Sequence, residues 1–263
     1  MILMPIPDFD FDPTETSVPW KILKDNGVET AFATPSGNPG KADPRMLTGK
    51  GLGIWKKALM AGDDALQYYS LMIQDSRFKM PVKYEDIRPS DYSGIILPGG
   101  HAPGMKTYLE SKKLQSIIVA FFDANKPVGA ICHGVLLAAR SIDPKTGKSV
   151  LYDYKTTALL KIQELFGYYL TRLWLGAYYR TYPITVEDEV TSHLSDRKNF
   201  FSGNSGLIRD SIDNTKHGFT VLDRNYLSAR WPGDAFSFSF EFLNLMRNAV
   251  PGMKWHGGFS RTA

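Results

Sequence analysis

Cysteine is almost absent from this sequence, because the 263 residues contain one cysteine, Cys132, beside five histidines. A single thiol cannot form a disulfide within the chain, and it cannot build a structural zinc site of several cysteines. The histidines show no His-x-x-x-His spacing or other pattern of metal ligands. We therefore expect no metal and no cofactor, and a fold that is stabilised by its hydrophobic core.

Long apolar runs and blocks of one charge are also missing. No segment approaches the ~20 apolar residues of a membrane span, and the opening MILMPIPDFDFDP lacks the basic start and long apolar stretch of a signal peptide. The 31 Lys and Arg and the 27 Asp and Glu are interspersed, with a net charge of +4. We expect a cytoplasmic protein that binds neither nucleic acid nor membranes.

Short apolar runs alternate with helical segments along most of the chain, and 43% of the residues are hydrophobic. This alternation predicts an α/β fold with a mostly parallel central sheet and helices on both faces. Between these elements, glycine and proline predict a loop at 36–53. The segment 143–154 is predicted to form a hairpin-like pair of edge strands. The expected strands cover 2–7, 28–35, 94–100, 127–132 and two segments within 218–231. The expected helices cover 18–27, 55–75, 107–125, 133–140, one or two within 156–180, and 234–250.

Cys132 lies at the junction of an expected strand and an expected helix. It ends the apolar run PVGAIC, with Gly129 before it and Gly134 after it. This order is typical of a nucleophile elbow, in which a strained turn holds a reactive side chain above the sheet. Because the N–H groups of a helix start favour a thiolate, we expect an unusually acidic Cys132. The alternative is a cysteine that only fills the core.

Three motifs resemble the ThiJ/PfpI superfamily, which contains intracellular proteases, glyoxalase III and deglycases. The motifs are AICHG at 130–134, ILPGGHAPGM at 96–105, and DPTETSVPW followed by FATP near the start. The resemblance implies a flavodoxin-like sandwich in which Cys132 is the nucleophile. It also implies that the chain acts on a small molecule.

The resemblance implies partners for the cysteine. A glutamate at the start of the first helix points at the sulfur in this family, and Glu15 has that position; the alternative is a glutamate that only stabilises its helix. Gly99 and Gly100 match the family's glycines at a strand end, where their N–H groups and that of His133 would form an oxyanion hole. His101, which follows them, is expected to line the pocket mouth or to lie in an exposed loop.

The third member of a catalytic triad is harder to place. In the branch of the family with the motif CHG, the histidine, here His133, pairs with an acidic residue roughly 30 positions later. This sequence departs from that pattern, because Ala158 or a neighbouring threonine aligns there. Asp153 is the nearest carboxylate, and an acid from a neighbouring subunit is the alternative. We therefore expect Cys132 and Glu15, assisted by His133, to carry the chemistry.

These residues favour a cofactor-independent enzyme that converts a 2-oxoaldehyde to a 2-hydroxy acid, as glyoxalase III does, or a deglycase. An amidase, peptidase or isocyanide-hydrating enzyme would use the same cysteine, and a stress chaperone or redox sensor would use it without turnover. Glutamine amidotransferases share the elbow but take their base from a late His-x-Glu pair. KHGF at 216–219 and WHGG at 255–258 lack that pair.

The same resemblance leads us to expect one domain over 1–263 and a homodimer. The region at about 155–215 is helical, rich in aromatic residues and atypical of the family. Its aromatic run at 166–183 is expected to fill the core, with a lid or a dimer face as the alternative. The tail at 251–263 is expected to be loosely held.

Overall fold

The computed structural model describes residues 1–204 and 208–249. A seven-stranded sheet runs through this part of the chain, with β8 antiparallel to β9 and every other neighbouring pair parallel. All residues of β1, β6 and β7 are buried, so the core lies on both faces of the sheet. In sheet order the strands are β5 (Val82–Lys83), β3 (Thr30–Thr34), β1 (Ile2–Pro5), β6 (Gly94–Leu97), β7 (Val128–Ile131), β9 (Tyr226–Ala229) and β8 (Thr220–Asp223).

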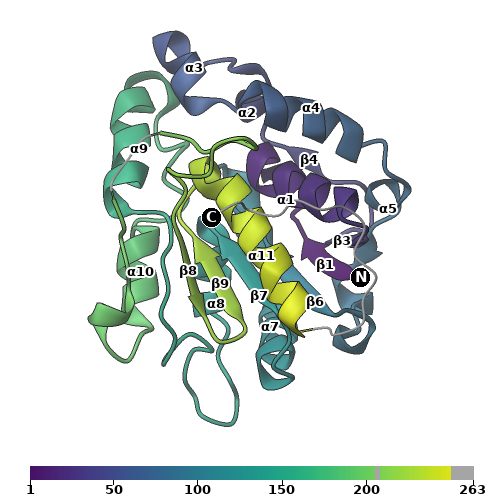
Figure 1. Cartoon of the computed structure of the whole chain (residues 1–263). Helices are drawn as coiled ribbons and strands as arrows, with labels where there is room; N and C mark the ends of the chain where they lie inside the picture. Colours follow the sequence, from purple (N-terminus) through teal and green to yellow (C-terminus); the bar gives the residue numbers. More distant parts are fainter. Residues whose placement is uncertain (205–207, 250–263) are drawn as a thin grey trace.

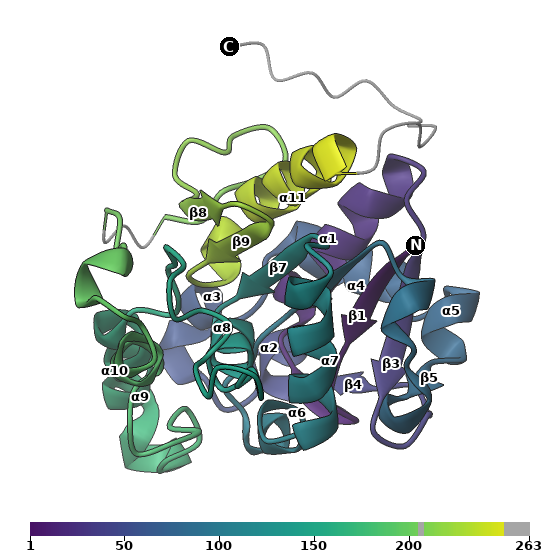
Figure 2. The ribbon, with the colours of Figure 1, turned by 90° about the horizontal axis from the view of Figure 1, so that it is seen from below.

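Helices cover both faces of this sheet, which confirms the predicted α/β class. On one face, α1 (Pro13–Asp25) packs between α4 (Asp63–Met72) and α11 (Ala235–Ala249). On the other face, α7 (Lys112–Asp123) packs beside α8 (His133–Ala139). Figures 1 and 2 show the sheet between these two layers.

The remaining elements lie around this sandwich. Two helices, α9 and α10, stand at the margin of the sheet beyond β8 (Figure 1), and α10 packs against α8. None of the described helices is long and apolar enough to cross a membrane. These elements are α2 (Pro44–Thr48), α3 (Lys56–Leu59), α5 (Ser76–Lys79), α6 (Lys106–Leu109), α9 (Lys161–Leu175), α10 (Val186–Ser192), and the small sheet of β2 (Phe9–Phe11) and β4 (Lys41–Ala42).

The start of α1 is fixed by its own sequence. The carboxyl of Asp12 accepts hydrogen bonds from the backbone N–H groups of Thr14 and Glu15, at 2.8 and 3.1 Å, and Pro13 occupies the first helical position. An aspartate cap followed by proline is a strong signal for a helix start. The cap therefore places Glu15 in the first turn, at the end of α1 that faces the site described below.

Two expectations about 36–75 are wrong in part. The expected helix at 55–75 is divided into α3 and α4, because the chain is extended at Met60 and at Gly62, which precedes α4. The expected loop at 36–53 contains the short helix α2, which begins after Asp43. The carboxyl of Asp43 accepts the N–H of Arg45 at 2.8 Å, so a local cap overrides the glycine-rich composition.

Three further expectations concern later segments. The hairpin expected at 143–154 is reduced to a single bridge between Ile142 and Ser149, because the segment is made mostly of turns. The aromatic run at 166–183 does not simply fill the core: α9 lies at the margin, so Tyr169 is 57% exposed, whereas Tyr179 is buried. The tail at 251–263 lies outside the described residues.

We predict opposite effects of the same substitution at two helical glycines. A Cβ at Gly134 in α8 would lie 2.0 Å from the carbonyl oxygen of Leu97, whereas a Cβ at Gly167 in α9 meets nothing within 4 Å. Gly134→Ala should therefore lower the free energy of unfolding by about 1–3 kcal/mol. Gly167→Ala should raise it by up to ~1 kcal/mol, because alanine favours helix. Urea denaturation measures both, and an unchanged or raised stability of Gly134→Ala would contradict the close packing of α8.

Candidate active site

Cys132 occupies the sharp turn between β7 and α8. Its backbone has φ 57° and ψ −123°, a conformation that a residue with a side chain adopts at a cost of about 1–3 kcal/mol. The N–H of Cys132 donates to the carbonyl of Ala229 on β9 at 3.1 Å, so pairing with the neighbouring strand holds the turn. The side chain is fully buried. This is the backbone geometry of a nucleophile elbow.

Glu15, in the first turn of α1, meets the cysteine from another part of the chain. Its side chain is fully buried, and Oε2 accepts the N–H of Gly99 at 2.8 Å. Its second oxygen, Oε1, has no nitrogen or oxygen partner among the described residues, and the carboxyl interacts directly with the Cys132 thiol. A Cβ at Gly99 would lie 2.7 Å from Oε2, so a glycine is needed for the carboxyl to fit.

Burial raises the pKa of both acidic groups. It raises the pKa of the Glu15 carboxyl well above its usual range, and the negative charge of Asp12 adds to this. Burial likewise raises the pKa of the Cys132 thiol, with further contributions from Glu15 and Asp12. The N–H of His133 favours the thiolate but does not outweigh burial. The expectation of an unusually acidic cysteine is therefore wrong, and both groups favour their protonated forms.

His133 is positioned as a base for this neutral thiol. Its Nδ1 lies 3.5 Å from the sulfur of Cys132, and its Nε2 lies 3.4 Å from the hydroxyl oxygen of Thr181. The Thr181 hydroxyl donates its one proton to the carbonyl of His101 at 2.6 Å. Toward Nε2 it can therefore only accept, so Nε2 carries the imidazole proton and Nδ1 presents a lone pair to the thiol. Burial lowers the pKa of His133, which favours this neutral imidazole.

An acidic residue is not in contact with His133 in the described part of the chain. Asp153 lies in an exposed turn, where its carbonyl accepts a hydrogen bond from Arg224 at 2.7 Å. Glu164 lies at roughly the spacing expected for the acid, but its carboxyl accepts the N–H of Val186 at the start of α10, at 2.9 Å. The position next to Nε2 thus belongs to Thr181, a neutral residue that sequence reasoning missed because no charge marks it.

The structure differs from the expected oxyanion hole in the role of Gly99. The N–H of Gly99 donates to Glu15, so it serves the carboxyl and is not directed at a substrate. The N–H of Gly100 makes no hydrogen bond to any residue that the structure describes, and the N–H of His133 lies at the Cys132 sulfur. The backbone groups available for an oxyanion are therefore those of Gly100 and His133.

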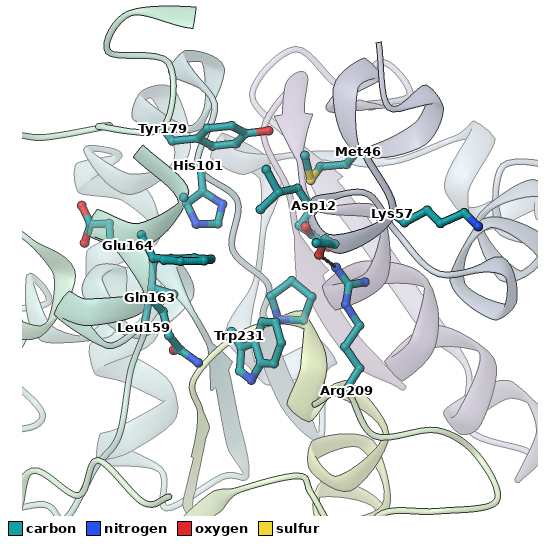
Figure 3. A pocket seen from close by; sticks show the side chains of 15 residues that line it. Asp12, Met46, Lys57, His101, Leu159, Gln163, Glu164, Tyr179, Arg209 and Trp231 are labelled. Atoms are coloured by element: carbon teal, nitrogen blue, oxygen red, sulfur yellow. Dashed lines mark hydrogen bonds between the residues drawn. The ribbon is translucent and has the colours of Figure 1, made fainter. Parts of the chain in front are cut away.

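His101 joins this centre to a cavity. Its ring packs edge-on against His133 and Tyr179, at centroid distances of 5.0 and 5.5 Å, and burial lowers its pKa to about 4. His101 and Asp12 line a cavity of about 320 Å³ (Figure 3). The cavity gives a small molecule a place beside the buried centre.

The same centre contains possible metal ligands. One donor atom from each of His101, Cys132 and His133 lies within 4.8 Å of the other two. Two imidazoles and a thiol suit an ion such as Zn²⁺. The spacing along the sequence did not predict this group, because His101 comes from a different loop.

A comparison with known proteins shows to which family this chain belongs. The model of the ThiJ/PfpI family-like proteins matches residues 6–203. The chain belongs to the ThiJ/PfpI family. This confirms the resemblance that the motifs around Cys132 carry.

Curated relatives of this ThiJ/PfpI protein include enzymes. It is 26% identical over 150 residues to glyoxalase 3 of Candida albicans, covering 56% of this chain and 58% of that protein. It is 32% identical over 171 residues to a deglycase of Pyrococcus horikoshii, covering 64% and 71%. The chain thus spans less than two thirds of the length of glyoxalase 3. The crystal structure of C. albicans glyoxalase III shares the fold, with a TM-score of 0.67 at 20% identity over 93% of this chain and 96% of that one.

We predict that the Cys132 thiol of the free protein ionises above the ~8.5 of an ordinary cysteine, because burial opposes the thiolate. The ultraviolet absorbance of the thiolate, followed against pH, reports on this residue alone because the chain has one thiol. Cys132→Ser supplies the baseline from tyrosine ionisation. A thiolate already formed at pH 7 would contradict the prediction.

Thr181 gives a second prediction. Thr181→Val keeps the shape of the side chain but removes the acceptor of the Nε2 proton, so alkylation of Cys132 by iodoacetamide should slow by on the order of tenfold to a hundredfold. The pH dependence of that rate should change as well, because the imidazole tautomer is no longer fixed. Thr181→Ser should restore both rate and profile. Equal reactivity of the Val and Ser variants would show that the Thr181 hydroxyl does not orient His133.

Proposed function

We propose that this protein is a cofactor-independent enzyme of the glyoxalase III type, which converts a 2-oxoaldehyde to a 2-hydroxy acid. The observation that carries the proposal is a buried Cys132 at a strained elbow, with Nδ1 of His133 3.5 Å from its sulfur and the buried Glu15 carboxyl in the same centre. A nucleophile and a proton carrier are thereby held against each other away from water. The relatives named glyoxalase 3 and deglycase support an enzyme of this class.

The reaction begins with the neutral thiol. As the sulfur of Cys132 attacks the aldehyde carbon, a C–S bond forms and Nδ1 of His133 takes the thiol proton. The aldehyde oxygen gains the negative charge, which the N–H groups of Gly100 and His133 stabilise until a proton reaches it. The product is a hemithioacetal on Cys132. The attack therefore needs no preformed thiolate, in keeping with the raised pKa of the thiol.

An internal oxidation and reduction follow. The former aldehyde carbon loses its hydrogen as a proton and an enediol forms, the neighbouring carbon is then protonated, and the hydroxyl proton of the hemithioacetal passes to the former ketone oxygen, so that a 2-hydroxy thioester results. We assign this transfer to Glu15, because its Oε1 has no nitrogen or oxygen partner within the described chain and the carboxyl interacts with the Cys132 thiol. Water then cleaves the thioester, which releases the 2-hydroxy acid and returns the proton to the sulfur.

A redox sensor is less compatible with this site. Cysteines that sense oxidants are accessible and form thiolates readily. Cys132 is fully buried, and burial raises the pKa of its thiol. Both properties slow oxidation by peroxide.

We predict that Cys132→Ala abolishes turnover of methylglyoxal without lowering the melting temperature by more than a few degrees, because loss of one sulfur leaves a small cavity. Glu15→Gln should lower turnover by a factor on the order of a hundred or more, since the amide cannot carry the proton. Asp153→Asn is the matched control, and this exposed site should stay within about twofold of the wild type. Lactate formation and thermal unfolding are the measurements. Equal turnover of Glu15→Gln and the wild type would overturn the assignment.

A further inference from the structure

The cavity beside His101 is larger than methylglyoxal requires. Its volume of about 320 Å³ would hold about ten water-sized groups at roughly 30 Å³ each. Most of its wall is apolar, with three aromatic rings among the lining side chains. The larger apolar residues of the wall are Met46, Leu59, Leu159, Phe166, Tyr179 and Trp231.

A single guanidinium interrupts this apolar wall. Arg209 is half-buried, and Figure 3 shows it across the cavity from His101 and Glu164. One of its nitrogens donates to the carbonyl of Ala58 at 3.1 Å, and the group lies 5.8 Å from the centre of the Trp231 ring. Arg209 makes no ion pair within residues 1–204 and 208–249. A guanidinium has five N–H donors, so most of them are available to a ligand.

The acidic side chains that line the cavity are already occupied. The carboxyl of Asp12 accepts the N–H groups that start α1, and the carboxyl of Glu164 accepts the N–H of Val186. Burial raises the pKa of both carboxyls, that of Glu164 to about 7, whereas the positive charge of Arg209 lowers the pKa of Asp12. Asp12 is thus the nearby negative charge for Arg209, but the two form no close ion pair in the described part of the chain, and Ala58 takes one of the guanidinium donors. The planar fork of a guanidinium matches a carboxylate, with two parallel hydrogen bonds.

We propose that the substrate is an aromatic 2-oxoaldehyde that carries a carboxylate at the end remote from the aldehyde. Arg209 binds the carboxylate, the rings of Phe166, Tyr179 and Trp231 pack against the aromatic body, and the aldehyde lies toward His101 and Cys132. The identity of the reacting end rests on the proposed function. The recognition of a carboxylate at Arg209 does not depend on it.

Binding of an unreactive pair of ligands tests the recognition by itself. Isothermal titration calorimetry would compare 4-(hydroxymethyl)benzoate with 4-(hydroxymethyl)benzamide, which have the same shape and differ in charge. We expect the carboxylate to bind the wild type at least about tenfold more tightly, and Arg209→Gln to abolish this preference. Lys57→Gln, at the exposed rim of the same cavity, is the matched control and should retain it. Equal binding of the two ligands by the wild type, or loss of the preference in Lys57→Gln alone, would overturn the proposal.

Turnover separates this proposal from the proposed function. The kcat/KM for 4-carboxyphenylglyoxal should exceed that for phenylglyoxal in the wild type by about tenfold, and the difference should disappear in Arg209→Gln. Should Arg209→Gln fail to fold, Arg209→Lys keeps the charge without the fork and should reduce the preference. A carboxylate preference in calorimetry without turnover of either aldehyde would refute the glyoxalase function and support the Arg209 site. Turnover of both aldehydes at equal kcat/KM would refute the site and leave the function standing.

Discussion

The burial of a carboxylic acid against a thiol is the interaction on which the rest of this centre depends. Glu15 and Cys132 are both fully buried, and Oε2 of the acid accepts the backbone N–H of Gly99. Because neither group ionises easily in that environment, the nucleophile needs a neutral base within reach. Nδ1 of His133 meets that need. The glycine at 99 leaves room for the carboxyl, and Thr181 fixes the tautomer that presents Nδ1 to the thiol.

The fold brings these groups together through its parallel strands. In an open α/β sheet the loops that follow neighbouring parallel strands meet at the carboxyl edge, where ligands bind. β1, β6 and β7 are neighbours in the sheet, and the chain reaches Glu15, Gly99 and Cys132 shortly after their ends. The region at 155–215 completes the centre from outside the sheet, because it supplies Thr181 and part of the cavity wall. The edge of the sheet and the segment at its margin therefore have separate tasks.

Local signals made the core of the site predictable from the sequence. The change from apolar strand to helix at Cys132 depends on neighbouring residues, so pattern alone placed the elbow correctly. The first helix was expected only from residue 18, whereas the Asp12 cap starts α1 at Pro13. Thr181 and Arg209 were missed, because they reach the site through long-range packing and nothing nearby marks them. The pKa of Cys132 was predicted in the wrong direction for a related reason. A helix start is visible in a sequence, whereas complete burial depends on every element that packs around the thiol.

The hydroxyl of Thr181 has one proton and two neighbours, and this gives the centre two alternative states. While the hydroxyl donates its proton to the carbonyl of His101, it accepts from Nε2, and His133 is a base toward Cys132. A ligand that draws the His101 backbone away would free that proton for Nε2. The imidazole proton would then belong on Nδ1, facing the sulfur, and His133 would become a donor to a thiolate. A shift of one loop would thus reverse the direction of proton flow, without any change of charge in the wall of the site.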